Sequence, residues 1–290
     1  MAGMLYLVAT PIGNLGDMTQ RAIETLREVD IIAAEDTRNS LKLINHFDIH
    51  TELTSYHEFN KYEKAEELLA MLEEGKNIAL ITDAGTPAIS DPGEVLVKMC
   101  ANAGITVTSL PGPCACITAL ILSGLSTRRF CFEGFLPTDK KERKEILTEI
   151  AGEKRTMIFY EAPHHLVRTL GELYKVLGER NITLCRELTK KFEEIERTTF
   201  EAALDYFETN EPRGEYVIVV EGKSREQLLR EKAEEWRDLS IKDHMNKYES
   251  AGYDHMEAIK KVARDRGVGK RDIYRKLLEP EVPMNPKEGK

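Results

Sequence analysis

A loop rich in aspartate, glycine and proline follows an apolar run in the first third of the chain. Residues 78–82 have the pattern of a buried strand, and the loop at 83–93 holds two residues each of Asp, Gly and Pro. In open α/β sheets, ligands bind in the crevice beyond the carboxyl ends of the strands. Glycine lets a ligand approach the main chain closely, and proline stiffens the loop. The composition of 83–93 therefore indicates a ligand-binding loop.

Two other loops that follow predicted strands, at 10–17 and 111–114, also carry Gly and Pro. The carboxyl ends of parallel strands share one edge of a sheet, so the three loops should lie together. None of them has the spaced glycines of a dinucleotide-binding turn or the Gly-Lys-Ser/Thr of a P-loop, which disfavours a nucleoside triphosphate. Simple connecting turns are the alternative. Together the loops favour a small ligand held largely by main-chain groups.

The elements that position these loops alternate between strands and helices. In the first half, helical patterns separate strands predicted at 5–9, 31–34, 53–56, 78–82 and 105–110. This order predicts a mostly parallel sheet with helices on both faces. In the second half, strands are predicted at 130–135, 156–160, 182–186, 192–199 and 216–221, and their uneven spacing favours a mixed sheet.

From Lys223 the sequence becomes charged and helical, with helices predicted at 226–239, 240–250, 256–266 and 270–278. The last two flank a turn with Gly267 and Gly269, which predicts a helix-turn-helix shape. We therefore expect an α/β fold of two α/β domains (1–122 and 123–222), a small α-helical C-terminal domain (223–280) and a disordered tail (281–290).

Composition limits the cellular compartment of the protein and the kinds of site it can hold. No apolar run approaches the roughly 20 residues of a membrane span, and the first apolar stretch, 4–9, has no basic flank. The five cysteines are an odd, scattered set, which disfavours a disulfide framework and a zinc site. We expect a cytoplasmic protein with no membrane partner, no metal site and buried, reduced cysteines.

The charge is unevenly distributed. The net charge of −9 argues against a nucleic-acid partner. Residues 256–278, however, carry eight Lys or Arg and only three Asp or Glu, which leaves a local net charge of +5. A charge run is often a solvated face, but a basic end on an acidic protein also suits RNA phosphates.

Five segments resemble motifs of the ribosomal RNA small subunit methyltransferase I family, and the resemblance runs in order through residues 4–222. They are VATPIGNLGD (8–17), AEDTR (34–38), DAGTPAISDPG (83–93), LPGP (110–113) and FYEAPH (159–164). The resemblance implies the tetrapyrrole methylase type of fold, with S-adenosylmethionine in a cleft between the two α/β domains, and a homodimer. It also implies 2′-O-methylation of a cytidine ribose in 16S rRNA, near the decoding centre, with the rRNA or the small ribosomal subunit as substrate.

The same resemblance implies positions for the cofactor. Ten residues are expected to bind it: Pro11, Gly13, Asp83, Gly85, Ile89, Ser90, Asp91, Cys114, Ala115 and Tyr160. Asp83 and Asp91 are also typical turn and cap residues. Relatives that methylate tetrapyrroles carry Gly-x-Gly-Pro-Gly-Asp in the first loop, where this chain has Ala-Thr-Pro-Ile-Gly-Asn. That departure favours rRNA over a tetrapyrrole substrate.

A base that takes the proton of a ribose hydroxyl would speed the reaction, although alignment alone could suffice. The candidates are Glu35, Asp36, His57 and Glu161. Each of the first three has a simpler interpretation: Glu35 as the ion-pair partner of Arg38, Asp36 as the cap of a helix beginning near Ser40, and His57 as a solvated loop residue.

RNA contacts are expected from two places. Arg38 follows the second strand at the ligand edge, and four basic residues share the last predicted helix: Lys270, Arg271, Arg275 and Lys276. A tetrapyrrole methyltransferase and a non-catalytic RNA-binding module are the alternative functions.

Overall fold

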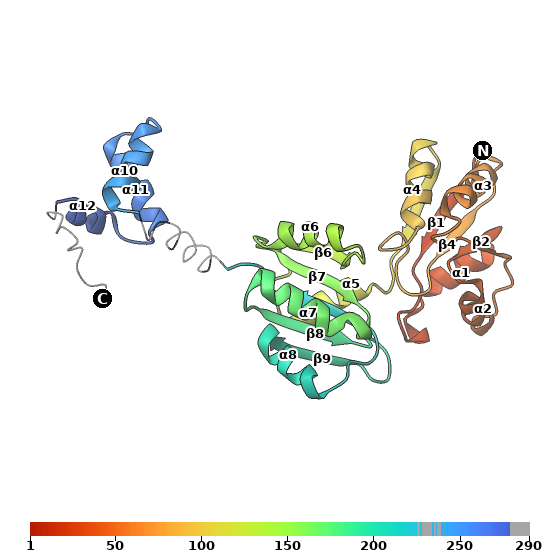
Figure 1. Ribbon diagram of the computed structural model, residues 1–290. Helices are drawn as coiled ribbons and strands as arrows, with labels where there is room; N and C mark the ends of the chain where they lie inside the picture. Colours follow the sequence, from red (N-terminus) through yellow and green to blue (C-terminus); the bar gives the residue numbers. More distant parts are fainter. Residues whose placement is uncertain (225–226, 228–233, 235, 237–238, 279–290) are drawn as a thin grey trace. The chain divides into compact units, whose positions relative to one another are not determined.

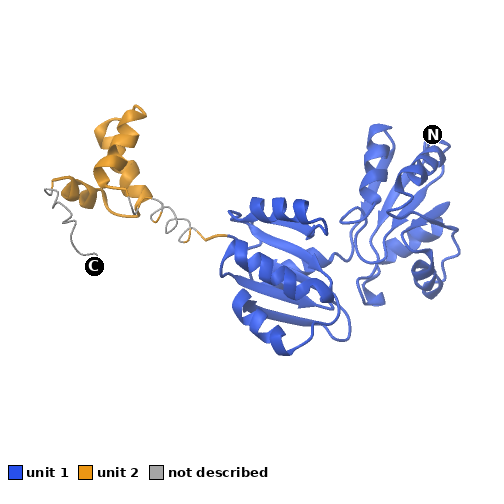
Figure 2. Cartoon of the chain, viewed as in Figure 1, with its two compact units in different colours: residues 1–222 blue, residues 223–290 orange. Residues whose placement is uncertain are grey.

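The computed structural model describes residues 1–224, 227, 234, 236 and 239–278. The chain forms two compact units, Met1–Gly222 and Lys223–Lys290 (Figure 2). Most of the helix predicted at 226–239 and the whole tail predicted at 281–290 lie outside the described residues. The first unit contains both predicted sheets, and the second contains the charged helices.

The first sheet is parallel throughout, as predicted. Its order is β3-β2-β4-β1-β5, made by β1 (Met4–Val8), β2 (Ile31–Ala34), β3 (Leu53–Ser55), β4 (Ile78–Ile81) and β5 (Thr106–Leu110). The adjacent inner strands β2 and β4 are buried on both faces, as expected of continuous apolar runs in a parallel sheet.

Helices cover both faces of this sheet (Figure 1). The helices α3 (Lys61–Glu73) and α4 (Gly93–Asn102) bury Leu68, Leu72 and Leu96 against one face. The helices α1 (Gln20–Glu28) and α2 (Thr37–His46) bury Leu26 and Ile44 against the other. The amphipathic spacing of these helices accounts for the two apolar layers.

The second sheet is mixed, which confirms the prediction. Its order is β6-β7-β10-β8-β9, made by β6 (Phe130–Phe135), β7 (Thr156–Glu161), β8 (Asn181–Arg186), β9 (Glu194–Thr199) and β10 (Tyr216–Val220). Only β6 and β7 pair in parallel. One face carries three helices: α6 (Lys140–Ile150), α7 (Pro163–Leu177) and α8 (Phe200–Thr209).

The other face of the second sheet is covered by α5 (Ala115–Ser123), whose residues follow the last strand of the first sheet. Cys116, Ala119 and Leu120 of α5 pack against Ile158, Val217 and Val219 of the second sheet. Arg197 of β9 donates to the carbonyl oxygens of Leu122 and Ser123 at the end of the helix. This packing ties α5 to the second sheet. The predicted division at residue 122 remains a sequence-based proposal.

In the second unit, the described helices are α10 (Ile241–Ser250), α11 (His255–Asp265) and α12 (Lys270–Leu278). Met245, Ile259, Val262 and Ile273 form their common apolar cluster. Side chains of Ser240 and Asp254 cap α10 and α11 by accepting hydrogen bonds from main-chain amides. Gly267 (φ +63°) turns the chain between α11 and α12, as the helix-turn-helix prediction requires.

Candidate active site

The three loops rich in Gly and Pro are hydrogen-bonded to one another at one edge of the first sheet. Thr10 and Gly85 exchange two main-chain hydrogen bonds, of 2.9 and 3.1 Å. The Thr86 hydroxyl donates to the carbonyl oxygen of Pro113 (2.9 Å). The prediction that these loops share one edge is therefore confirmed.

The loop at 83–93 is held in an unusual conformation by one side chain. Ala88 and Ser90 have φ of +66° and +62°, in the left-handed region that costs energy for residues with a Cβ. The carboxylate of Asp91 accepts hydrogen bonds from the amides of Ala88 (3.0 Å), Ile89 (3.1 Å) and Gly93 (2.8 Å). Three charge-assisted bonds offset the strain and fix the shape of the loop.

The second sheet supplies the facing wall. Because β10 is antiparallel to both β7 and β8, its first residues lie at the same edge as the ends of those strands. The loop after β8 also reaches the first sheet: a Cβ at Gly13 would lie 2.3 Å from Cγ of Lys190. Only glycine fits at position 13, so the loop after β1 and the loop after β8 pack directly together.

The two walls enclose a cavity of about 450 Å³. Eight of the ten predicted cofactor residues line it: Asp83, Gly85, Ile89, Ser90, Asp91, Cys114, Ala115 and Tyr160. So do Glu35 and Glu161. Loops from both halves of the first unit line the cavity. Its volume lies in the range of small-molecule sites (about 300–1,000 Å³).

The other two predicted residues, Pro11 and Gly13, line a second cavity of about 250 Å³. It lies between the loop after β1 and the middle of α2 (residues 39–43), and Thr82 and Asp83 line both cavities.

The carboxylates on the first-sheet side are only partly engaged. Glu35 accepts from the Thr82 hydroxyl through Oε2 (2.9 Å), and Asp83 accepts from the amide of Asp36 through Oδ1 (3.3 Å). Among the described residues, nothing donates to the other oxygen of either group. The suggestion that Glu35 pairs with Arg38 is wrong, because Glu35 bonds to Thr82 instead.

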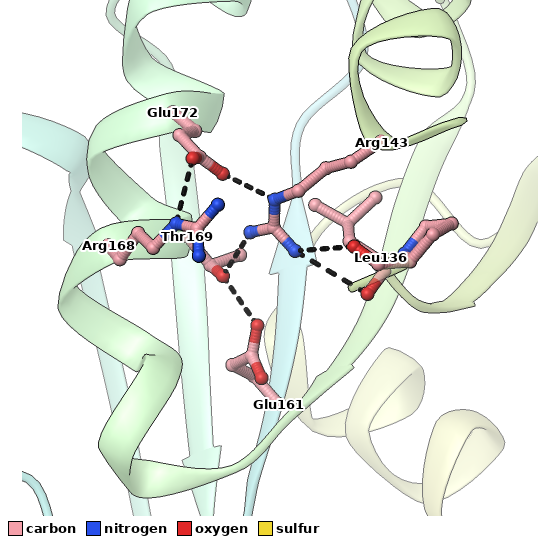
Figure 3. A network of polar contacts seen from close by, with 7 residues as sticks. Leu136, Arg143, Glu161, Arg168, Thr169 and Glu172 are labelled. Atoms are coloured by element: carbon pink, nitrogen blue, oxygen red, sulfur yellow. Dashed lines mark hydrogen bonds and ion pairs between the residues drawn. The ribbon is translucent and has the colours of Figure 1, made fainter. Parts of the chain in front are cut away.

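Glu161 lies on the opposite wall and is 5% exposed. One of its oxygens accepts from the amide of Ala162 (2.9 Å), and the other accepts from the Thr169 hydroxyl. Thr169 in turn accepts from the buried guanidinium of Arg143 (2.7 Å), which also pairs with Glu172 (2.5 Å), as Figure 3 shows. Both oxygens of Glu161 are thus occupied by the protein.

Three candidate residues lie outside both cavities. Asp36 caps α2, which begins at Thr37 rather than near Ser40, and the hydrogen bonds from Arg38 lower the pKa of Asp36. Arg38 is 88% exposed and pairs with Asp36. His57 follows β3, and its amide donates to Asn60 (2.8 Å). Its side-chain Nδ1 is buried without a partner among the described residues.

Two neighbouring thiols lie at the start of α5. Cys114 precedes the helix, and its Sγ lies 3.4 Å from Sγ of Cys116. The hydrogen bond from the Cys116 thiol, aided by the amide of Ile117, lowers the pKa of Cys114 and raises that of Cys116. Tyr160 fixes this turn by accepting from the amide of Cys116 (3.1 Å), and burial raises its pKa, so the phenol stays neutral.

Sequence reasoning missed one part of the site, the loop after β8. Glu187, Leu188 and Lys190 line the larger cavity. Glu187 and Thr189 have φ of +50° and +65°, conformations that glycine usually signals. Because neither residue is glycine, the only available signal was the position of the loop directly after a strand.

The four predicted RNA-binding residues of the second unit are exposed on α12, while Ile273 faces the apolar cluster. All five cysteines are free, but Cys114 and Cys131 are only half-buried, so the expectation of buried cysteines is wrong for these two. The described residues contain no group of His, Cys, Asp and Glu side chains that could hold a metal ion. None of the described helices has the length and apolar character needed to cross a bilayer.

Comparison with known proteins shows which family this chain belongs to. The model of the tetrapyrrole (corrin/porphyrin) methylases matches residues 4–204. The fold is also that of solved structures of the class: uroporphyrin III C-methyltransferase from Thermus thermophilus superposes with a TM-score of 0.54 at 18% identity, over 76% of this chain and 97% of that chain. The cobalt precorrin-4 methyltransferase gives a TM-score of 0.55 at 20% identity, over 75% and 94%.

Closer relatives share sequence over nearly the whole chain. A protein of Halalkalibacterium halodurans named ribosomal RNA small subunit methyltransferase I is 51% identical over 94% of this chain and 93% of its own length. The protein of the same name from Bacillus subtilis is 48% identical over 94% and 93%. The chain therefore belongs to the tetrapyrrole methylase family, and within it to the ribosomal RNA small subunit methyltransferase I proteins. Its cofactor is S-adenosylmethionine.

Proposed function

We propose that the chain methylates the 2′-oxygen of a cytidine ribose in 16S rRNA, near the decoding centre, with S-adenosylmethionine in the larger cavity. The observation that carries this proposal is the cavity itself, where eight residues expected to bind the cofactor converge from separate loops. The names of the relatives support small-subunit rRNA as the substrate.

The larger cavity suits this cofactor in size and lining. Its walls combine residues 83–86 and 89–91 with the apolar residues Ile12, Leu188 and Val217. Gly85 has a φ of +87°, and a Cβ there would lie only 3.2 Å from Cγ2 of Ile12, so the position favours glycine and leaves the main chain open to a ligand. When bound, S-adenosylmethionine supplies a methyl group activated by a positively charged sulfur. Carboxylates on the cavity wall complement that charge.

The protein must align the ribose oxygen and remove its proton. Holding the reactants in line accounts for much of the rate, and a positioned base contributes about 10²–10⁴-fold. Of the four candidate bases, Glu35 and Glu161 line the cavity. Since both oxygens of Glu161 already accept hydrogen bonds, we assign it a structural role in the cavity wall and not the role of base. Glu35 keeps one oxygen for a ligand. Asp36 and His57 lie outside the cavity, so we do not assign either of them as the base.

The second unit is proposed to bind rRNA. Its exposed residues Lys270, Arg271, Arg275 and Lys276 lie on one short helix. Phosphate contacts from such residues dominate RNA affinity and make it salt-dependent. Replacing all four by Gln in the full chain should weaken binding to small subunits and flatten its salt dependence, with cofactor affinity unchanged. If this variant binds rRNA as tightly as the original protein, the second unit does not bind rRNA through these residues.

The decisive experiment incubates the full-length protein with unmethylated small ribosomal subunits and labelled S-adenosylmethionine. Mass spectrometry of the digested rRNA should find one new methyl group on a cytidine ribose. Methylation of a base, or methylation of a uroporphyrinoid but not of rRNA, would contradict the proposal. Calorimetry with S-adenosylhomocysteine is the control for cofactor binding, and its failure would favour a non-catalytic RNA-binding protein.

A further inference from the structure

The second cavity is a separate, smaller site beside the cofactor cavity. At about 250 Å³ it has little more than half the volume of the larger one. We propose that it binds the target nucleotide of the RNA, with the ribose against Asp83, the base against Asn39 and a phosphate at Lys42. This inference rests on the proposed function and names the site of the nucleotide whose ribose accepts the methyl group.

The two cavities adjoin each other. Among the residues of the described chain, Thr82 and Asp83 are the two that line both. Thr82 is fixed there, because its hydroxyl donates to Glu35 and its carbonyl oxygen accepts from the hydroxyl of Thr10 (3.1 Å). An acceptor oxygen must lie next to the methyl donor, so a nucleotide in the second cavity would meet the donor at Asp83.

Positive charge lies at the second cavity. Lys42 lines the cavity and is exposed, and no carboxylate in the described part of the chain lies within ion-pair distance of it. Arg38 precedes it by one turn of α2, outside the cavity and paired with Asp36. An ammonium group at the mouth of a cavity, with a second cation on the same helix face, suits the phosphates that flank a nucleotide.

The remaining lining of the second cavity suits a base. Asn39 presents an amide that can both donate and accept, which is what the Watson–Crick edge of a base requires. Leu43 offers an apolar surface for the ring. The volume of about 250 Å³ suits a small group such as one nucleotide flipped from its stack.

This arrangement gives Asp83 a chemical role. The ribose O–H bond leaves its electron pair on oxygen while the proton passes to the Asp83 carboxylate. The oxygen forms its new bond to the methyl carbon as the carbon–sulfur bond breaks, which leaves a neutral thioether and a methylated ribose. Oδ1 of Asp83 accepts from the amide of Asp36, so Oδ2 is the oxygen that takes the proton.

The test compares matched pairs in the full-length protein. Lys42→Ala and Asn39→Ala are each measured against a control on a helix that covers the first sheet, Lys98→Ala on α4 and Asn45→Ala at the far end of α2. All four side chains are exposed, so the fold should persist. We expect the KM for small subunits to rise about fivefold or more for the two cavity variants. The controls should match the original protein, and Lys42→Arg should recover most of the affinity.

A steric variant gives a second readout. Asn39→Trp places a large ring at the mouth of the second cavity and should abolish rRNA methylation, while S-adenosylhomocysteine binds as before. If Lys42→Ala, Asn39→Ala and Asn39→Trp all methylate subunits with the original KM, this inference is wrong although the proposed function stands. If the original protein methylates no rRNA, the proposed function itself fails.

Discussion

The two walls of the larger cavity differ in how much their charged groups are already bonded. On the second-sheet wall, Glu161 accepts two hydrogen bonds, and Lys190 pairs with both Glu187 and Glu215 at 2.9 Å. On the first-sheet wall, Asp91 is fully bonded as well, but Glu35 and Asp83 each keep one oxygen to which no described residue donates. Saturated groups are held rigidly, whereas groups with spare hydrogen-bonding capacity can act on a ligand. The second-sheet wall therefore has mainly a structural role, and the first-sheet wall supplies the groups that can react with a ligand.

The sharpest test of this contrast is Asp83→Asn. If Asp83 takes the ribose proton, kcat should fall by about 10²–10⁴-fold while the affinity for S-adenosylhomocysteine is retained. Steady-state methylation of small subunits and calorimetry measure the two quantities. Asp205→Asn on α8, an exposed aspartate outside both cavities, is the control. A kcat equal to that of the control would exclude Asp83 as the base and leave Glu35 as the candidate on this wall.

The second-sheet wall should respond in stability rather than in chemistry. Arg143→Ala removes the cation that bonds Thr169 and Glu172, and breaking such a buried pair costs about 3–5 kcal/mol of unfolding free energy. Glu172 also pairs with Arg168, which is 54% exposed, so Arg168→Ala should cost less than about 1 kcal/mol. Urea unfolding measures both. Similar costs for the two variants would mean that the network does not brace this wall.

Cys114, at the start of α5, should react as a thiolate. The hydrogen bond from the Cys116 thiol holds the pKa of Cys114 below that of an ordinary thiol, so the thiolate is present at a lower pH than usual and is lost as the pH falls further. Alkylation by iodoacetamide should therefore reach half its maximal rate at a pH below about 8.5, the ordinary pKa of a thiol. Cys131, whose pKa burial raises to about 12, is the internal control and should stay unreactive at neutral pH.

Since Cys114 lines the larger cavity, saturating S-adenosylhomocysteine should protect it from alkylation. Peptide mass spectrometry reads both cysteines in one sample. A midpoint near pH 8.5, the ordinary value for a thiol, would contradict the hydrogen bond from Cys116. Alkylation at the same rate with and without S-adenosylhomocysteine would place the cofactor elsewhere.

The smallest expected effect concerns the shape of the first-sheet wall. Asp91→Ala removes the three hydrogen bonds that hold Ala88 and Ser90 in left-handed conformations. The loop should relax, and the affinity for S-adenosylhomocysteine should fall about tenfold, which corresponds to about 1.4 kcal/mol. Calorimetry measures this change. An unaltered affinity would show that the cofactor does not use the main chain of this loop.

The alternation of elements and the polar loops after the strands could be predicted from sequence, because both follow from local patterns. Strand β2 and helix α12, for example, have the predicted bounds. The packing of α5 could not be predicted: it is apolar on most sides, so its pattern selects neither sheet. The loop after β8 was missed because Glu187 and Thr189 adopt glycine-like conformations through tertiary contacts. Nor could sequence show that Glu161 is saturated, since Arg143 and Thr169 lie on different helices.

The most direct test of the account is a crystal structure of the full-length protein with S-adenosylhomocysteine. We expect the ligand in the larger cavity, with its sulfur on the side of Thr82 and Asp83 and its contacts on the main chain of 85–91. A ligand bound outside this cavity, or one whose sulfur faces Glu161 and away from Asp83, would contradict the assignment of chemistry to the first-sheet wall.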